Sequence, residues 1–217
     1  MVPLVTQPDL KVTKTVDFRR AVAALKHGDA IVFPTETLYG LGADALNGDA
    51  VARVFQLKGR DRQNPIPVLV ADEGMLLSLV REIPSTARKL MHRFWPGPLT
   101  LVMPARPGVP PALVNRDGGI GVRISSQPIA TQLVQALGRP LTATSANPSG
   151  QEPARTVEQA AQYFGRQIEL FVDAGPLASR TGSTVVQVLG ATLKIIRDGE
   201  ISAAQLQEVL DREELSR

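Results

Sequence analysis

Residues 30–42 read AIVFPTETLYGLG, an apolar run that passes directly into a polar stretch containing two glycines. The apolar run at 30–33 stops at Pro34, which predicts a short buried strand that ends there. The polar stretch joins small hydroxyls, one acid and two glycines at this strand end. Ligands of α/β proteins bind at strand ends, so the stretch is a candidate site. The alternative is an ordinary turn with local hydroxyl hydrogen bonds.

Helical and strand patterns alternate on both sides of this stretch. The expected helices are 18–27, 50–58, 76–80, 85–95, 128–137, 156–164 and one from 202, and the expected strands are 30–33, 67–70, 99–103, 120–124, 140–146, 168–173, 183–189 and 192–197. This alternation predicts an α/β fold, and the run of three strands near the end predicts a mixed sheet. No repeat or linker divides the chain, so 1–217 is expected to be one domain, with 1–14 as a mobile arm.

Composition excludes several kinds of site. The 217 residues hold 24 Lys and Arg against 21 Asp and Glu, so the formal net charge is only +3. Eighteen of the cations are arginine, whose planar fork suits phosphate and carboxylate. The absence of cysteine excludes disulfides and thiolate chemistry, and two histidines argue against a histidine-rich metal site. With no apolar run of membrane-spanning length and no signal-peptide pattern, we expect a cytoplasmic protein.

Residues 40–45, GLGADA, fit the dinucleotide-binding fingerprint G-x-G-x-x-G/A. That fingerprint needs its glycines at the turn from strand to helix, where the backbone meets a pyrophosphate. Here six residues separate the expected strand from the first glycine, and the stretch NGD at 47–49 interrupts any helix. We therefore reject a dinucleotide site.

Four further stretches gather polar groups, each with two interpretations. KGRDRQNP at 58–65 either neutralises a helix end or grips a triphosphate. Arg123 lies in an apolar strand, so either an acid or a bound anion must face it. TATSANPSG at 142–150 either caps the sheet or donates to ligand oxygens. RTGST at 180–184, with Arg197 downstream at a strand end, is the fourth.

Together these stretches resemble one family. PTETLYGLG at 34–42, KGR at 58–60, NP at 64–65, WPGPLT at 95–100, Arg123, SAN at 145–147 and ST at 183–184 occur in the order and spacing of the YrdC-like threonylcarbamoyl-AMP synthases. The resemblance covers about residues 15–200 and is to the short, single-domain, TsaC-like form. It implies an open, twisted mixed α/β sheet with helices packed on it and a large basic concave cleft.

The resemblance also implies an activity. Members of the family make threonylcarbamoyl-adenylate from L-threonine, bicarbonate or CO2, and ATP with Mg2+, and they release pyrophosphate. The product passes to a threonylcarbamoyl transferase complex for tRNA modification. Weak RNA or tRNA binding is a further expectation, and no membrane partner is expected.

The site residues follow by matching motifs. Lys58 and Arg60 would be the catalytic pair that holds the ATP phosphates. The implied ATP-binding residues are Lys58, Arg60, Asn64, Ser145, Asn147 and Arg197. The implied threonine-binding residues are Thr35, Arg123 and Ser183, with Arg123 on the amino acid carboxylate. No protein side chain is assigned to a metal.

One departure and two alternatives remain. Leu69 stands where many family members have a histidine, so the substrate contact that the resemblance implies for that histidine is not expected here. The first alternative is an RNA-binding module that uses a basic cleft without adenylate chemistry, although aromatics are only 4% of the chain and offer little stacking surface. The second is the related carbamoyl-adenylate chemistry of hydrogenase maturation proteins, which are much longer and contain zinc-finger-like parts.

Overall fold

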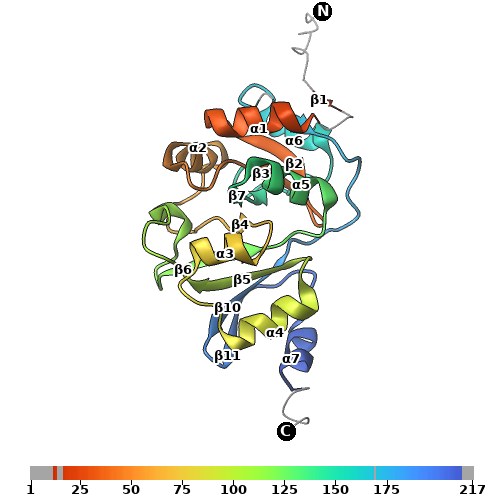
Figure 1. The fold of residues 1–217 in the computed structure, drawn as a ribbon. Coiled ribbons are helices and arrows are strands. Elements are labelled where there is room, and N and C mark those ends of the chain that lie inside the picture. The colour runs from red at the N-terminus through yellow and green to blue at the C-terminus, as the bar shows by residue number, and fades with distance from the viewer. Residues whose placement is uncertain (1–11, 14–16, 169, 212–217) are drawn as a thin grey trace, which may run out of the picture.

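The computed structural model describes residues 12–13, 17–168 and 170–211, which form helices and two sheets (Figure 1). The helices are α1 (Phe18–His27), α2 (Gly48–Lys58), α3 (Glu73–Leu79), α4 (Ser85–Phe94), the 3-10 helix η1 (Pro111–Leu113), α5 (Pro128–Leu137), α6 (Val157–Phe164) and α7 (Ala203–Asp211). The strands are β1 (Val12–Thr13), β2 (Ile31–Pro34), β3 (Tyr39–Gly42), β4 (Val68–Leu69), β5 (Leu99–Pro104), β6 (Gly119–Arg123), β7 (Leu141–Thr142), β8 (Thr144–Ser145), β9 (Phe171–Val172), β10 (Thr184–Leu189) and β11 (Thr192–Arg197).

The strands divide into a five-stranded sheet, ordered β1-β9-β2-β3-β8, and a six-stranded sheet, ordered β11-β10-β5-β6-β4-β7. Each combines parallel and antiparallel pairs, which confirms the expected mixed α/β fold. The division into two sheets was not predicted. The expected strand 140–146 supplies one strand to each sheet, β7 and β8, with Ala143 between them.

The two sheets occupy different halves of the molecule. In Figure 1, β2 and β3 lie in the upper half with α1 and α6, whereas β5, β10 and β11 lie in the lower half with α4 and α7. The first half therefore carries the polar stretch after β2, and the second carries the strands that contain Arg123 and Arg197. Any site shared by these residues must lie where the halves meet.

Polar and glycine caps mark the ends of α1 and α2. Asp17 accepts a hydrogen bond from the backbone N–H of Arg20 and starts α1, and Gly28 ends it with a φ of +98°. Gly59 ends α2 in the same left-handed conformation, with a φ of +58°. Because Gly59 ends α2, Lys58 is the last residue of the helix and Arg60 lies in the loop that follows.

Strand β3 was not predicted, and it explains the two glycines of the rejected fingerprint. Gly40 and Gly42 lie within β3, which pairs antiparallel with β2. A Cβ atom on Gly42 would lie 2.6 Å from the Phe33 ring, so the ring occupies the space that a side chain would need. Because neither glycine stands at a strand-to-helix turn, the structure confirms that this is not a dinucleotide-binding motif.

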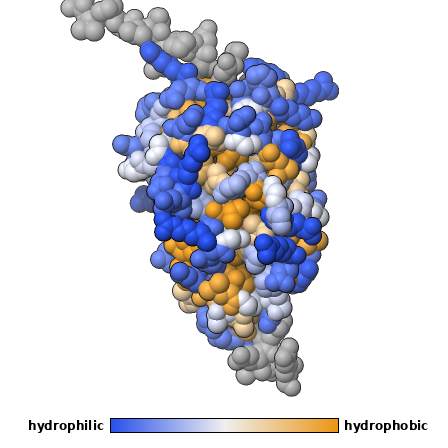
Figure 2. Space-filling view, turned by 90° about the vertical axis from the view of Figure 1, so that its left-hand side faces the viewer, coloured by the Kyte–Doolittle hydropathy of each residue, from blue (hydrophilic) through white to orange (hydrophobic). Residues whose placement is uncertain are grey.

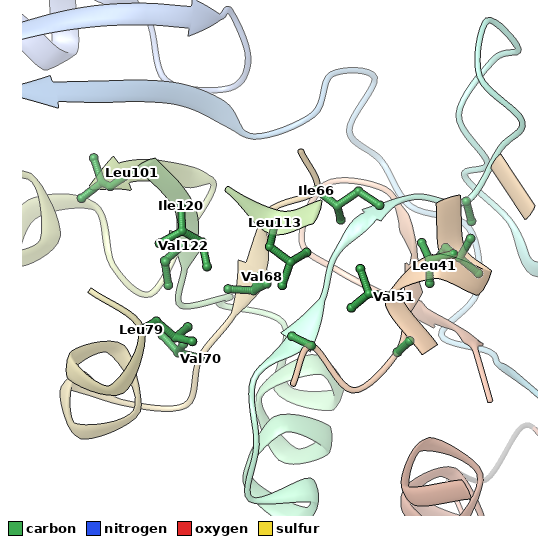
Figure 3. Packing of buried hydrophobic residues seen from close by; sticks show 14 of the residues in the cluster. Leu41, Val51, Ile66, Val68, Val70, Leu79, Leu101, Leu113, Ile120 and Val122 are labelled. Carbon is green, nitrogen blue, oxygen red and sulfur yellow. The ribbon is translucent and has the colours of Figure 1, made fainter. Parts of the chain in front are cut away.

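A continuous apolar core joins the two halves. Its largest cluster includes Leu41 of β3 together with Val68 and Val122 of the six-stranded sheet, and Figure 3 shows the neighbourhood of these side chains. A second cluster, with Leu69 and Phe33, packs under α1 and α5. The core fixes how the two sheets meet.

The face drawn in Figure 2 is mostly hydrophilic, with several apolar patches between the hydrophilic side chains. Among the described helices, none combines the length and the apolar character needed to cross a membrane.

Within the segment expected to be an N-terminal arm, Val12 and Thr13 form β1 and pair with β9. Residues 1–11 and 14 of that segment lie outside the described residues.

Candidate functional site

A pocket of about 220 Å³ lies where the two sheets meet. It is lined by Thr35, Thr37, Leu38, Tyr39, Gly40, Arg60, Pro67, Arg123, Ala143, Thr144, Ser145, Pro153, Gly182, Ser183 and Arg197. The β2–β3 hairpin and β8 supply one side, and the ends of β6, β10 and β11 supply the other. The expectation of a large basic concave cleft stays a prediction beside this smaller, defined pocket.

The loop between β2 and β3 is organised around the Thr35 hydroxyl. This hydroxyl donates to the Leu38 carbonyl over 2.6 Å and accepts from the backbone N–H groups of Thr37 and Leu38 at 3.2 and 3.1 Å. The sequence left open a turn or a ligand site here. The structure shows the turn, and it places Thr35 and Thr37 on the pocket wall as well.

Arg123 faces an acid, which was one of the two expected alternatives. Its Nη1 atom lies 3.0 Å from Oε1 of Glu36, with exposed side-chain fractions of 6% and 13%. The Ser125 hydroxyl donates to the other carboxylate oxygen of Glu36. Burial lowers the pKa of Arg123, and the Glu36 charge opposes that shift. The ion pair joins the β2–β3 loop of one sheet to the last residue of β6 in the other.

Arg197 and Ser183 form a second contact at the pocket. The Arg197 guanidinium donates to the Ser183 carbonyl from Nη2 over 2.7 Å and to the Ser183 hydroxyl over 3.1 Å. The Ser183 hydroxyl also lies 2.8 Å from the Thr100 hydroxyl. A Cβ atom on Gly182 would lie 3.1 Å from Arg197 Nη2, so this glycine leaves room for the guanidinium to lie against the backbone.

Arg60 reaches the pocket from the loop after α2. Its Nε donates to the Asn64 carbonyl over 2.7 Å, which closes the loop 60–64 on itself. Asn64 is exposed and does not line the pocket. The structure therefore gives Asn64 a backbone contact to Arg60, while its predicted contact with ATP stays a prediction.

Lys58 lies behind the pocket wall. Its Nζ donates to the carbonyls of Ser145 and Asn147 over 2.6 and 2.8 Å, and the residue is only 2% exposed. Burial, with a contribution from the Arg60 charge, lowers the Lys58 pKa to about 7. Lys58 thus ties the end of α2 to the SAN stretch that contains Ser145. When it is protonated, the Lys58 ammonium has three N–H donors, so one remains for a ligand.

Asn147 is buried beside this contact. Its amide nitrogen donates to the carbonyls of Pro148 and Gln151 over 2.9 and 2.8 Å. Its Oδ1 atom is buried and has no hydrogen-bond partner within the part of the chain that the structure describes. Buried acceptors are nearly always satisfied, so this atom is available to a donor from a ligand or a water.

The pocket is strongly cationic. Arg60, Arg123 and Arg197 all line it, and none of the lining residues is acidic. Burial lowers the pKa of Arg60, and partial burial together with the charges of Arg123 and Arg60 lowers that of Arg197. Guanidiniums gathered at one pocket favour a multiply charged anion.

Most of the site residues predicted from the sequence lie at this pocket. Six of the nine predicted site residues line the pocket: Thr35, Arg60, Arg123, Ser145, Ser183 and Arg197. Lys58 and Asn147 lie one layer behind it, and Asn64 lies outside.

Sequence reasoning missed the roles of Glu36 and Ser125, although Glu36 stands within the quoted stretch at 34–42. Leu69, in the position of the frequent histidine, is buried in the core.

The family model described as "Telomere recombination", for Sua5, YciO and YrdC proteins, matches residues 23–199. The chain belongs to this family. It is 40% identical over 190 residues to a Mycobacterium tuberculosis protein named, provisionally, as a threonylcarbamoyl-AMP synthase, with 88% of this chain and 87% of that protein covered. Threonylcarbamoyl-AMP synthase of Bacillus subtilis is 36% identical over 199 residues, and the chain spans 58% of its length.

Solved structures of the Sua5/YciO/YrdC family agree with the fold. Pyrococcus abyssi Sua5 complexed with L-threonine is 35% identical and superposes with a TM-score of 0.86, covering 91% of this chain and 59% of that one. Escherichia coli YciO is 26% identical with a TM-score of 0.79, covering 87% and 92% of the two chains. The predicted family and the α/β fold are both confirmed.

Proposed function

We propose that this chain is a threonylcarbamoyl-AMP synthase, which makes the adenylate used in the first step of tRNA threonylcarbamoyladenosine formation. The observation that carries the proposal is the pocket that gathers Arg60, Arg123 and Arg197 with the hydroxyls of Ser145 and Ser183. This pocket occurs in a family whose named members include threonylcarbamoyl-AMP synthases. One solved structure of the family is Sua5 complexed with L-threonine. The RNA-binding alternative has no comparable support.

The reaction needs alignment more than it needs a protein nucleophile. The threonine amine and bicarbonate give a carbamate and water, and a carbamate oxygen then attacks the α-phosphorus of ATP. The bond from the α-phosphorus to the bridging oxygen breaks, and pyrophosphate leaves with that oxygen. Two anions must therefore be held together, and fixed guanidiniums offset their repulsion while they are in line.

The pocket divides between the substrates as the motifs imply. On the amino acid side, Arg123 would take the threonine carboxylate, with Ser183 and Thr35 beside it. On the nucleotide side, Arg60, Arg197 and Ser145 would meet the ATP, together with the buried Asn147 and the exposed Asn64. Lys58 would act on the phosphates with its remaining N–H while it holds the SAN stretch.

Mg2+ is proposed to arrive with ATP. Within the described residues no group of three or more His, Cys, Asp or Glu side chains is placed to hold a metal ion. Mg2+ often keeps its waters and binds mainly to substrate phosphates, which fits such a site. When bound it would neutralise charge on the triphosphate. A cytoplasmic location and a downstream threonylcarbamoyl transferase belong to the same proposal.

The test is pyrophosphate release from ATP with Mg2+. L-Threonine is compared with L-serine, glycine and no amino acid, each with and without bicarbonate. We expect release that requires L-threonine and bicarbonate together. In the same assay, Lys58→Ala and Arg60→Ala should slow release by about 10²–10³-fold, the usual loss for one preorganised electrostatic contact. No release from folded wild-type protein would contradict the proposal, and salt-dependent RNA binding would then favour the alternative.

A further inference from the structure

Glu36 has no role in the site as described so far, yet it makes the only carboxylate contact to a pocket arginine among the described residues. Its Oε1 lies 3.0 Å from Arg123 Nη1, and its Oε2 accepts from Ser125. Glu36 itself does not line the pocket, whereas Arg123 does. The Arg123 guanidinium thus has Glu36 on one side and the pocket on the other.

The Glu36 backbone is held by its neighbours in the loop. Thr35 on one side and Thr37 and Leu38 on the other share the hydrogen bonds of the Thr35 hydroxyl. The backbone N–H of Thr35 also donates to the Leu38 carbonyl over 3.2 Å. Because β2 and β3 pair directly on either side, this four-residue loop has little freedom. The Thr35 hydroxyl therefore fixes the backbone from which the Glu36 side chain extends.

The other partners of Glu36 are fixed as well. Arg123 is the last residue of β6, and its carbonyl accepts from Val70 over 3.0 Å. The Ser125 hydroxyl accepts from the backbone N–H of Gln127 over 3.2 Å, and the residue is buried. An arginine side chain has several rotatable bonds, so the Glu36 contact is what selects the guanidinium position. A buried guanidinium without such a partner would be strongly disfavoured.

We propose that Glu36 is a positioning residue, which holds the Arg123 guanidinium in the orientation that receives the carboxylate of the amino acid substrate. Thr35 supports it by fixing the loop, so its effect on threonine binding passes through Glu36 and Arg123. This inference rests on the proposed function, because it assumes that an amino acid occupies the pocket. It adds a residue outside the pocket lining to the determinants of amino acid affinity.

A contrary role for the same contact makes the opposite prediction. If Glu36 merely occupied the place of the substrate carboxylate, L-threonine would have to displace it, and removing its charge would tighten binding. If Glu36 positions Arg123, removing its charge weakens binding. The sign of the change in affinity separates the two roles.

The experiment measures L-threonine affinity in Glu36→Gln by calorimetric titration, together with the KM values for L-threonine and ATP. We expect the dissociation constant and KM for L-threonine to rise by about tenfold or more, since one partner of a buried charge pair is lost. The KM for ATP should stay within about threefold, because a lost ground-state contact acts on its own substrate. Glu36→Asp, which keeps the charge, should lie closer to the wild type.

The matched control is Glu73→Gln. Glu73 pairs with Arg88 over 2.7 Å between Oε1 and Nη1, but both side chains are about half exposed and neither lines the pocket. This variant should leave both KM values unchanged. If Glu36→Gln fails to fold, Ser125→Ala still removes a donor to the Glu36 carboxylate without changing any charge. It should weaken L-threonine binding about threefold, roughly the value of one hydrogen bond.

Unchanged or tighter L-threonine binding in Glu36→Gln, or in Ser125→Ala where it replaces that variant, overturns the proposal while leaving the synthase function intact. An equal rise of both KM values also overturns it, because that pattern indicates a general structural defect. If the wild-type protein neither binds L-threonine nor releases pyrophosphate, the proposed function itself has failed, and this inference fails with it. Selective weakening for L-threonine supports both.

Discussion

Lys58 brings a charge into the protein interior with only backbone carbonyls as partners. Its Nζ donates to Ser145 and Asn147, and the described residues place no carboxylate in an ion pair with it. Burial, helped by the charge of Arg60, lowers its pKa to about 7 from an ordinary value of 10.5. A group whose pKa differs between the folded and unfolded states makes the free energy of unfolding depend on pH.

We expect the free energy of unfolding to rise with pH between about 7 and 10. In this range the unfolded chain keeps the Lys58 proton, whereas the folded protein has lost it. Unfolding therefore takes up a proton and becomes less favourable as pH increases, by up to about 1.4 kcal/mol per pH unit. Below pH 7 both states are protonated, so the slope from Lys58 disappears.

Urea unfolding at pH 7, 8 and 9 checks this expectation against Lys58→Met, whose side chain cannot titrate. The wild type should gain about 1 kcal/mol per pH unit relative to the variant. The variant leaves two carbonyls without their donor, which changes its absolute stability at pH 7, so only the slope is compared. Parallel pH dependences of the two proteins would show that Lys58 keeps an ordinary pKa.

At the residue scale, the sequence could predict that a buried charge requires a partner, but it could not predict which residue that partner is. An arginine inside the apolar strand at 120–124 required an anion, and that requirement could be stated without a structure. Its partner Glu36 lies 87 positions away, and the two come together only because the two sheets meet between the β2–β3 loop and the end of β6. For the stretch that contains Thr35 the sequence offered a ligand site and a turn with local hydroxyl hydrogen bonds, and the structure shows the hydrogen bond of the turn.

At the element scale, β3 depends on the absence of side chains at its glycines. A Cβ atom on Gly42 would lie 2.6 Å from the Phe33 ring and 3.1 Å from the Thr142 carbonyl. Phe33 is fully buried, so its ring cannot move into solvent. We expect Gly42→Ala to lower the free energy of unfolding by about 1–3 kcal/mol, as overpacking of a core does. Thermal unfolding measures the loss as a lower Tm.

Gly48→Ala is the control for this prediction. Gly48 begins α2, and a Cβ atom there would meet nothing within 4 Å. Alanine should therefore leave stability unchanged or raise it by less than about 1 kcal/mol, because it restricts the unfolded chain. If Gly42→Ala were as stable as Gly48→Ala, the Phe33 ring would not be the reason for the glycine in β3.

Element boundaries were predictable where a local signal marks them. Gly28, Gly59 and Gly138 each end a helix in the left-handed conformation, and the helices at 18–27 and 128–137 have their predicted limits. Strand β3 carries glycines at alternate positions, and β4, β7, β8 and β9 have two residues each. The strands expected at 67–70, 140–146 and 168–173 contain these short strands, but two residues show no periodicity, so only tertiary pairing defines their limits. The division of the expected strand 140–146 between the two sheets, at Ala143, is likewise defined only by tertiary pairing.

At the scale of the whole molecule, the pocket exists because the two halves meet. Arg60 follows α2, Arg123 ends β6 and Arg197 ends β11, so no single half supplies the cationic lining. Like charges held together in the folded state repel one another, and that repulsion disappears in the unfolded chain. An anion that binds among them relieves the repulsion and favours the folded state over the unfolded one.

We therefore expect pyrophosphate, one product of the proposed reaction, to raise the Tm of the wild-type protein. At about 100 times its dissociation constant a ligand adds about 2.7 kcal/mol, which corresponds to about 5–10 °C for a domain of this size. The shift should shrink between about 0.05 and 0.5 M NaCl, because salt screens partly exposed charges. Differential scanning calorimetry measures both quantities.

Arg197→Ala and Arg88→Ala separate binding at the pocket from a general effect of anions. Arg197 lies at the pocket and contacts Ser183, whereas Arg88 forms an exposed pair with Glu73 elsewhere on the surface. Both variants lose one positive charge, so a nonspecific anion effect would fall equally in the two. Binding at the pocket predicts a smaller pyrophosphate shift only in Arg197→Ala. An equal shift in the two variants would place the anion elsewhere and remove the electrostatic reason for bringing the two halves together at this pocket.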